Sequence, residues 1–275
     1  MQLACRCRAA EWHGACVGRF ADATKACMPA TARTPTKPAA PKAAARKTAP
    51  KPASKAATAT ATLTISSKNY SSWSLRGWLL AKFAGIDFAE QMVSPDDADA
   101  RRELLLLAPS IRVPCLTHDG ARVWNTLAIA QYLDELQPEA GLFPEDRIAR
   151  AHCRSVSGEM NSGFSNLRSS LPMNLKARYP GHKIWGGAQP DIDRIVEIWN
   201  DCLATYGGPY LFGARRTVAD AMYAPVATRF LTYDVKLNRA CIEYSRTIMA
   251  MPEMAEWVAA AKLEPDDIEE LDMDF

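Results

Sequence analysis

The chain has 275 residues, 48% of them hydrophobic, and its 33 basic and 31 acidic residues nearly cancel. This length holds one large domain or two modest ones and permits a substantial core. No apolar run has the length that a secretory signal or a membrane span requires. The cysteines of the body, Cys115, Cys153, Cys202 and Cys241, lie far apart without a C-x-x-C pair, and the four histidines are scattered. We therefore expect a cytoplasmic protein with neither a disulfide scaffold nor a metal site.

The nearly neutral total hides two regions of opposite charge. Residues 1–62 carry a net charge of about +9 and the remainder about −7. From Thr31 to Thr62 the chain is almost entirely Ala, Pro, Lys and Thr, which bury too little apolar surface to offset the entropy of ordering. We therefore expect residues 1–61 to be a disordered basic tail, and residues 263–275 to be an acidic C-terminal tail. Three roles stay open for the basic tail: a passive linker or a translated stretch upstream of a later start such as Met28, which we favour, a transit peptide, or an arm that binds nucleic acid weakly.

The first folded segment is a strand at Leu63–Ile65 that leads into an amphipathic helix ended by Gly85. Three hydroxyls gather at this junction, in the run Ser71-Ser72-Trp73-Ser74-Leu75-Arg76. A helix start has unpaired N–H groups and the positive end of the macrodipole, so it favours an anion. Serine hydroxyls at this place either donate hydrogen bonds to a thiolate or an oxyanion, or simply cap the helix.

The next elements complete a small mixed domain over residues 62–137. A hairpin is expected around His118-Asp119-Gly120, and Asn125 or Thr126 caps the helix that follows it. The expected elements in chain order are a strand at Ile86–Val93, a helix opened by Ser94-Pro95 and running to Leu107, strands at Val113–Thr117 and Ala121–Trp124, and the capped helix. The order β-α-β-α-β-β-α predicts a thioredoxin-like sheet with helices packed on it.

Strand signals disappear after Pro138, and an all-helical bundle is expected over residues 145–262. Residues 145–178 are expected to form one long helix bent near Pro172, and residues 190–206 a second. Thr217-Val218-Ala219-Asp220 is a capping box that opens a third helix, and Pro252 begins a last one. The predicted fold class is therefore an α/β domain followed by an all-α domain.

A serine-bearing helix start, a Val-Pro before a hairpin and a capped helix directly after it resemble the glutathione S-transferases. The likeness covers roughly residues 62–262. The run from Ser71 to Arg76 is most similar to the Ser-Ser-x-Ser-x-Arg signature of the zeta-like group. The run from Leu211-Phe212-Gly213 to Asp220-Ala221-Met222-Tyr223-Ala224-Pro225 is similar to the helix-capping motif of the family's second domain.

This resemblance implies a role for each matching residue. Ser71 would donate its hydroxyl to the sulfur of glutathione, the co-substrate, with Ser72 beside it, and Arg76 would be a structural or electrostatic support. The resemblance places further glutathione contacts at Arg112, Val113, a cis Pro114, Asn125 and Thr126. Val113 would pair its backbone with the cysteinyl part of glutathione, and Asn125 and Thr126 would hold the γ-glutamyl group. Because Asn125 is neutral where the family has a carboxylate, one ion pair is lost, and we expect glutathione binding to be weak.

Some aromatic side chains are expected to line a substrate pocket and others to lie in the core. Tyr70 and Trp73, on an exposed loop, and Phe164 in the second domain are candidates for a pocket that takes a small electrophile, although helical spacing such as that of Phe164 is more often core. Trp78 and Trp124 are expected in the core. Helix arginines such as Arg168 are usually solvated, so we give an acidic-substrate role little weight.

The leading interpretation is a homodimeric glutathione S-transferase that activates the glutathione thiolate for attack on an electrophilic carbon or for a zeta-like cis–trans isomerisation. The alternative is a non-catalytic binding or regulatory protein with the same fold. A glutathione-dependent thiol reductase would require a cysteine at Ser71 or Ser72 and is disfavoured. We expect no membrane partner, and nucleic-acid contacts only through weak binding by the tail.

Overall fold

The computed structural model describes residues 61–93 and 113–265. The expectations for the basic tail up to residue 60, the helix from Ser94, Arg112 and residues 266–275 fall outside these ranges. No helix in them is both long enough and apolar enough to cross a membrane.

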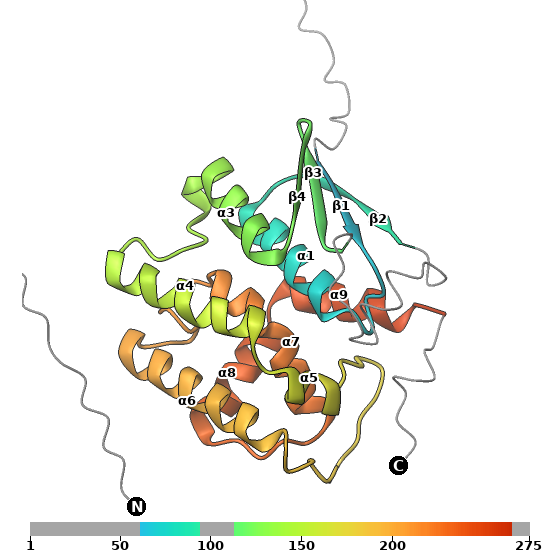
Figure 1. Cartoon of the computed structure of the whole chain (residues 1–275), viewed down its shortest axis with the longest axis vertical. Helices are drawn as coiled ribbons and strands as arrows, with labels where there is room; N and C mark the ends of the chain where they lie inside the picture. The colour runs from blue at the N-terminus through green and yellow to red at the C-terminus, as the bar shows by residue number, and fades with distance from the viewer. Residues whose placement is uncertain (1–60, 94–112, 266–275) are drawn as a thin grey trace, which may run out of the picture. The chain divides into compact units, whose positions relative to one another are not determined.

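The two predicted domains follow each other along the chain. The elements are β1 (Ala61–Ile65), α1 (Ser72–Ala84), β2 (Phe88–Met92), β3 (Cys115–His118), β4 (Ala121–Trp124), α3 (Thr126–Leu136), the 3-10 turn η1 (Pro138–Ala140), α4 (Arg147–Ser162), α5 (Ser165–Ser170), α6 (Gln189–Tyr206), α7 (Val218–Thr232), α8 (Arg239–Met249) and α9 (Pro252–Lys262). Figure 1 shows α1 and α3 beside the strands, α9 alongside α1, and the other helices from α4 to α8 on the side away from the sheet. The thioredoxin-like domain followed by a helical domain is thus confirmed.

The sheet has the strand order β2-β1-β3-β4. β1 pairs in parallel with β2 and antiparallel with β3, and β3 pairs antiparallel with β4. Asp119 and Gly120 both have positive φ, 46° and 81°, as a two-residue hairpin turn requires. The alternate residues Ala61, Leu63 and Ile65 of β1 are buried in the core. β1 therefore buries one face in the core and leads through a short loop to the serine run.

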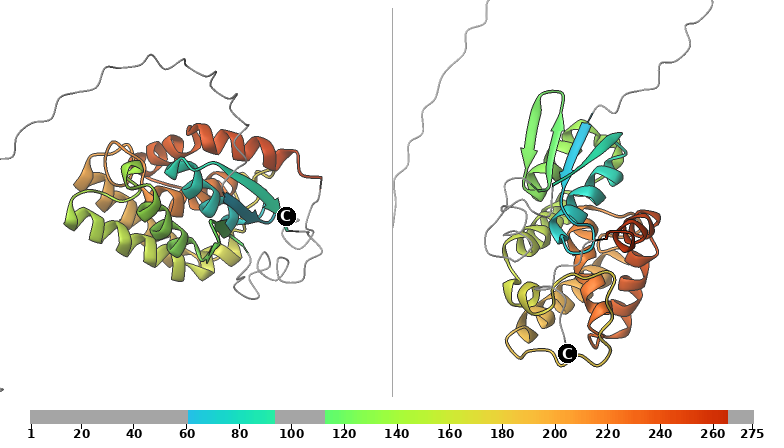
Figure 2. Two further views of the ribbon diagram at one scale, coloured as in Figure 1. Left: turned by 90° about the horizontal axis from the view of Figure 1, so that it is seen from above. Right: turned by 90° about the vertical axis from the view of Figure 1, so that its right-hand side faces the viewer.

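Helix α1 joins the sheet to the helical domain. It packs against β1, α3, α7 and α9, and Figure 2 shows it between the strands and the helical part. The fully buried Arg76 donates from Nε to the carbonyl oxygen of Met222 in α7 at 2.8 Å. Trp78 packs on Trp257 of α9 with ring centroids 5.2 Å apart. The start of α1 is thereby held by both domains.

The single helix expected over residues 145–178 is wrong. The chain breaks at Gly163 and Phe164, between α4 and α5, and has no further helix until α6. Phe164 adopts a left-handed φ of 60° while its side chain is buried. Asp191 of α6 stabilises the new helix start, since its carboxylate accepts from the Leu167 amide at 2.9 Å. Burial of Phe164 and a cap supplied from α6 thus override the continuous helical pattern.

The predicted capping box at Thr217 is confirmed. The Asp220 carboxylate accepts from the Thr217 amide at 2.7 Å and, across the fold, from the Tyr244 hydroxyl at 3.2 Å.

Tyr244 lies on α8, a helix that the sequence pattern does not predict. Asn238 caps α8 by accepting from the Cys241 amide at 3.0 Å.

Gly77 allows α1 to approach the loop before β3, and its replacement is expected to destabilise the fold. A Cβ at Gly77 would lie 2.5 Å from Pro114 Cβ, inside van der Waals contact. We expect Gly77→Ala to lower the free energy of unfolding by about 1–3 kcal/mol through overpacking. Gly158 of α4 is the matched control, because nothing lies within 4 Å of its added Cβ. Gly158→Ala should raise the stability by about 0.5–1 kcal/mol. Urea unfolding measures both, and equal effects would contradict the close packing.

Candidate functional site

Ser71 forms the N-cap of α1. Its backbone is extended, and its Oγ accepts a hydrogen bond from the Ser74 amide at 3.2 Å. The side chain is almost completely buried, with 1% exposed. A hydroxyl that accepts such a bond retains its hydrogen as a donor. The capping role and the anion-stabilising role considered for this serine are therefore compatible.

The other two serines of the run have different surroundings. Ser72 is the first residue of α1 and is 4% exposed. Ser74 faces the end of β1, where its Oγ accepts from the Ser66 amide at 3.0 Å. Ser71 and Ser72 thus lie at the positive end of the helix dipole, while Ser74 joins the helix to the sheet.

The loop before β3 contains the expected cis bond. The Val113–Pro114 peptide is cis, and Val113 is 3% exposed. The ring of Pro114 packs on the Cα of Gly77 in α1. The segment expected to pair with a peptide ligand therefore lies against the same helix that carries Ser71.

The start of α3 has a strained cap and an unsatisfied hydroxyl. Asn125 has φ 71° and ψ 129°, and its Oδ1 accepts from the Leu127 amide at 2.9 Å. A non-glycine residue with positive φ is uncommon, and such strain concentrates at functional sites. Thr126 is 1% exposed, and its Oγ1 has no hydrogen-bond partner within the described part of the chain. This buried hydroxyl, at a helix N-terminus, suits a carboxylate.

Trp73 lies between two arginines. The guanidinium of Arg76 is 4.5 Å from the centre of its ring and that of Arg168 is 4.8 Å away. Arg168 belongs to α5 and was expected to be solvated, but it packs against this tryptophan. Arg229 of α7 is fully buried, and burial together with the charge of Arg168 lowers its pKa to about 9. Two guanidinium groups therefore lie against Trp73.

Two aromatic expectations are wrong in the structure. Tyr70 is 5% exposed and belongs to the core rather than to an exposed loop. Trp124 is 51% exposed, because β4 is the edge strand and its alternate residues Arg122 and Trp124 face solvent. Phe164 is 7% exposed and packs in the core. Trp73 is thus the predicted pocket residue that remains partly accessible.

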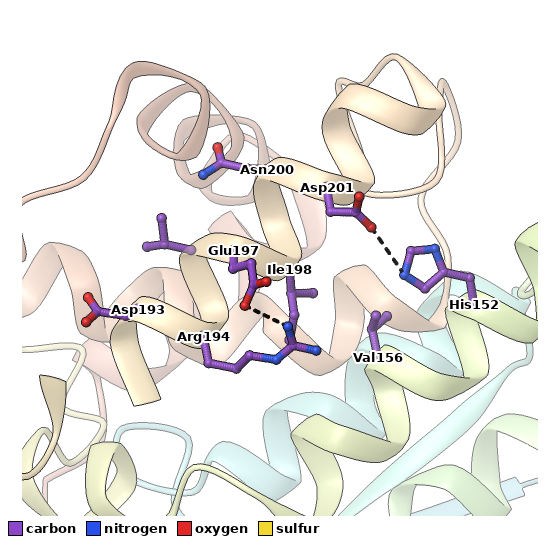
Figure 3. A pocket seen from close by; sticks show the side chains of 9 residues that line it. His152, Val156, Asp193, Arg194, Glu197, Ile198, Asn200 and Asp201 are labelled. Carbon is purple, nitrogen blue, oxygen red and sulfur yellow. Dashed lines mark hydrogen bonds and ion pairs between the residues drawn. The ribbon is translucent and has the colours of Figure 1, made fainter. Parts of the chain in front are cut away.

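A separate hollow of about 750 Å³ opens between α4 and α6 (Figure 3). Its lining contains none of the predicted site residues. His152 Nε2 lies 3.7 Å from Asp201 Oδ2, and Arg194 donates to Glu197 at 2.7 Å. Among the described residues, no cluster of His, Cys, Asp and Glu could hold a metal ion.

A serine-capped first helix on a thioredoxin-like sheet, joined to a helical domain, defines the class of glutathione-using transferases. A family model described as "Glutathione S-transferase, N-terminal domain" matches residues 70–136, and one described as "Glutathione S-transferase, C-terminal domain" matches residues 145–260. The chain belongs to the glutathione S-transferase family.

Individual relatives agree with the zeta-like signature. A probable maleylacetoacetate isomerase of Caenorhabditis elegans is 29% identical over 164 residues, covering 58% of this chain and 75% of the relative. The maleylacetoacetate isomerase of Rattus norvegicus is 28% identical over 170 residues, covering 61% and 76%. Among solved structures, the maleylacetoacetate isomerase of Anaeromyxobacter dehalogenans with bound glutathione has a TM-score of 0.55 at 21% identity, covering 75% of this chain and 97% of that one. A glutathione S-transferase of the clam Laternula elliptica has a TM-score of 0.56 at 20% identity, covering 74% and 95%.

The unpartnered hydroxyl of Thr126 provides a direct check that glutathione fits this site. Thr126→Val removes the hydroxyl but keeps the shape of the side chain, so we expect unchanged or slightly higher stability. The glutathione affinity should be about five- to ten-fold weaker, because one hydrogen bond to the ligand is lost. Thr228→Val is the matched control: the buried Thr228 hydroxyl donates to the Pro225 carbonyl at 2.8 Å. This control should lose about 1 kcal/mol of stability and keep the affinity. Calorimetric titration and thermal unfolding measure the two quantities. Unchanged affinity in Thr126→Val would remove Thr126 from the site.

Proposed function

We propose that this chain stabilises the glutathione thiolate with serine hydroxyls at the start of α1, for attack on an electrophilic carbon or for a cis–trans isomerisation. The observation that supports this best is the pair Ser71 and Ser72, both buried at the N-terminus of one helix. A free thiol has a pKa of about 8.5, so only a few per cent is thiolate at neutral pH. Lowering that pKa by about 1.5–2 units corresponds to roughly 2–3 kcal/mol, which hydrogen bonds and a helix dipole can supply.

The remaining contacts would orient glutathione along two helix starts. Val113 would offer its backbone to the cysteinyl part, beside Arg112 and Pro114. Thr126 would donate to the γ-glutamyl carboxylate, and Asn125 would accept from its amino group. Asn125 Oδ1 already accepts from the Leu127 amide, and a neutral amide attracts the ammonium group less than a carboxylate does. Weak glutathione binding follows from both points.

The isomerisation is the more strongly supported of the two reactions. Several relatives are named maleylacetoacetate isomerase, and the run from Ser71 to Arg76 resembles the zeta-like signature. The two guanidinium groups on Trp73 favour an electrophile that carries negative charge. In such a reaction the thiolate adds to a conjugated double bond, rotation follows, and elimination restores both the double bond and the thiolate. Ser71 and Ser72 would hold the sulfur as an anion before addition and after elimination.

Two substitutions of Ser71 distinguish its role as the N-cap of α1 from its proposed role in stabilising the glutathione thiolate. Ser71→Ala should lose about 1 kcal/mol of stability as well as thiolate stabilisation, whereas Ser71→Asp keeps a good cap. The aspartate should nevertheless raise the pKa of the bound thiol by about one unit or more, since it offers no proton and adds a like charge. Ser72→Ala should also raise that pKa while leaving the cap intact. Ultraviolet titration of the bound thiolate against pH, with calorimetry, measures these effects.

The outcomes of that experiment separate the two function classes. A wild-type chain that binds no glutathione at millimolar concentration would favour the non-catalytic binding protein. A wild-type thiolate fraction retained in both Ser71→Asp and Ser72→Ala would leave the transferase without its serine mechanism.

We also propose that the chain forms a homodimer in the cytoplasm. Trp124 is 51% exposed on the edge strand β4, and large exposed aromatic side chains are enriched at protein interfaces. Trp124→Ser should weaken the dimer, and sedimentation equilibrium would measure the shift. Sedimentation of the wild type at the mass of one chain would contradict this assembly.

A further inference from the structure

Glu264 reaches the loop before Ser71 from the far end of the chain. It follows α9, and its carboxylate accepts three hydrogen bonds from the turn between β1 and α1. The donors are the Ser67 hydroxyl at 2.7 Å, the Lys68 amide at 2.5 Å and the Asn69 amide at 3.0 Å. A carboxylate that accepts from several converging donors forms strong, charge-assisted hydrogen bonds. The turn is therefore organised around this one side chain.

The bonds continue without a gap to Ser71. The Ser67 hydroxyl, which donates to Glu264, accepts from the amides of Asn69 and Tyr70 at 3.1 and 3.2 Å. The Ser67 carbonyl accepts from the Ser71 amide at 3.0 Å. Every backbone amide from Lys68 to Ser71 is thus bonded to Glu264 or to Ser67. The carboxylate consequently determines the path of the backbone into the helix start.

Glu264 is itself held in place. Its carbonyl oxygen accepts from Lys176 Nζ at 2.8 Å. Trp257 of α9 donates from Nε1 to the Lys68 carbonyl at 2.9 Å, so α9 and Glu264 just after it hold both the amide and the carbonyl of Lys68. Asn69 is fully buried, and its side chain accepts from the Leu175 amide at 2.7 Å. The turn is clamped between α9 and the loop after α5, which leaves little freedom once the carboxylate is in place.

We propose that Glu264 is a positioning residue for the thiolate-stabilising serines. It touches neither Ser71 nor Ser72, and it acts by fixing the turn that sets where their hydroxyls point. This inference rests on the function proposed above for the serine pair. The C-terminal end of the helical domain thereby contributes to the chemistry of the first domain.

Replacing the charged Glu264 by glutamine distinguishes the positioning role from a direct effect of the Glu264 charge on the pKa of the bound thiol. A negative charge near the sulfur disfavours the thiolate, so its removal in Glu264→Gln would by itself lower the pKa of the bound thiol. Loss of positioning acts in the opposite direction. A glutamine has one acceptor oxygen, and its NH₂ group would face a donor of the turn. The sign of the pKa change therefore distinguishes the two effects.

The experiment compares Glu264→Gln with Glu256→Gln. Glu256 is on α9, the helix that precedes Glu264, is exposed, and pairs with Lys82 at 2.9 Å, so the control removes the same charge without touching the turn. Ultraviolet titration of bound reduced glutathione should show a five- to ten-fold smaller ratio of thiolate to thiol at neutral pH in Glu264→Gln, that is, a raised pKa, and no change in the control. Hydrogen exchange at residues 68–71, measured without glutathione, should be at least ten-fold faster in Glu264→Gln alone.

Each result has a defined meaning. A lowered or unchanged thiol pKa in Glu264→Gln, with glutathione still bound, would overturn the positioning role and leave the proposed function intact. Unchanged exchange at residues 68–71 would overturn it whether or not glutathione binds. Wild type without glutathione binding would instead overturn the proposed function. A lower melting temperature with unaltered thiol pKa would identify a merely structural contact.

Discussion

The structure depends on how the first turn of α1 is held. Arg76, one turn into this helix, places a guanidinium in a fully buried position and donates to the Met222 carbonyl of α7. A buried charge is costly unless hydrogen bonds compensate it, so the helices must meet in an arrangement that keeps this bond. From the other side, Gly77 admits the ring of Pro114, and Ser74 joins the end of β1. The two domains, the sheet and the loop before β3 thus all depend on one helix start.

Local patterns predicted most of the elements, and two failures have clear physical causes. The Asp119-Gly120 turn and the capping box at Thr217 are each decided by neighbouring residues, and both appeared as expected. The break at Phe164 is decided by Asp191, which lies on another helix. Helix α8 carries buried side chains at helical spacing, but they are Cys241, Tyr244, Ser245 and Ile248. With one aliphatic residue among the four, the apolar periodicity was too weak to indicate a helix.

The candidate site shows the same division between local and distant causes. The serine run and the Val-Pro bond are readable because each is a short segment with a known preference. Trp124 was misplaced because a two-residue period shows which residues share a face, but not which face of an edge strand the helices cover. The sequence alone places Glu264 in an acidic tail. Nothing near it indicates a partner almost the whole folded chain away, and only the assembled fold brings it to Lys68 and Asn69.

The three serines of the run divide the work of one helix start. Ser74 points to β1 and fixes the helix, Ser71 caps it, and Ser72 is buried at its first position. A helix start used for binding must leave donors unpaired, although unpaired buried donors are costly. Structural bonds on Ser74, Glu264 and Arg76 help to keep such a helix start ordered. In the proposed reaction selectivity is separated in the same way: α1 would hold the thiolate, whereas Arg168 of the helical domain contacts Trp73. Under that proposal, changes on α5 would alter the choice of electrophile without disturbing the sulfur.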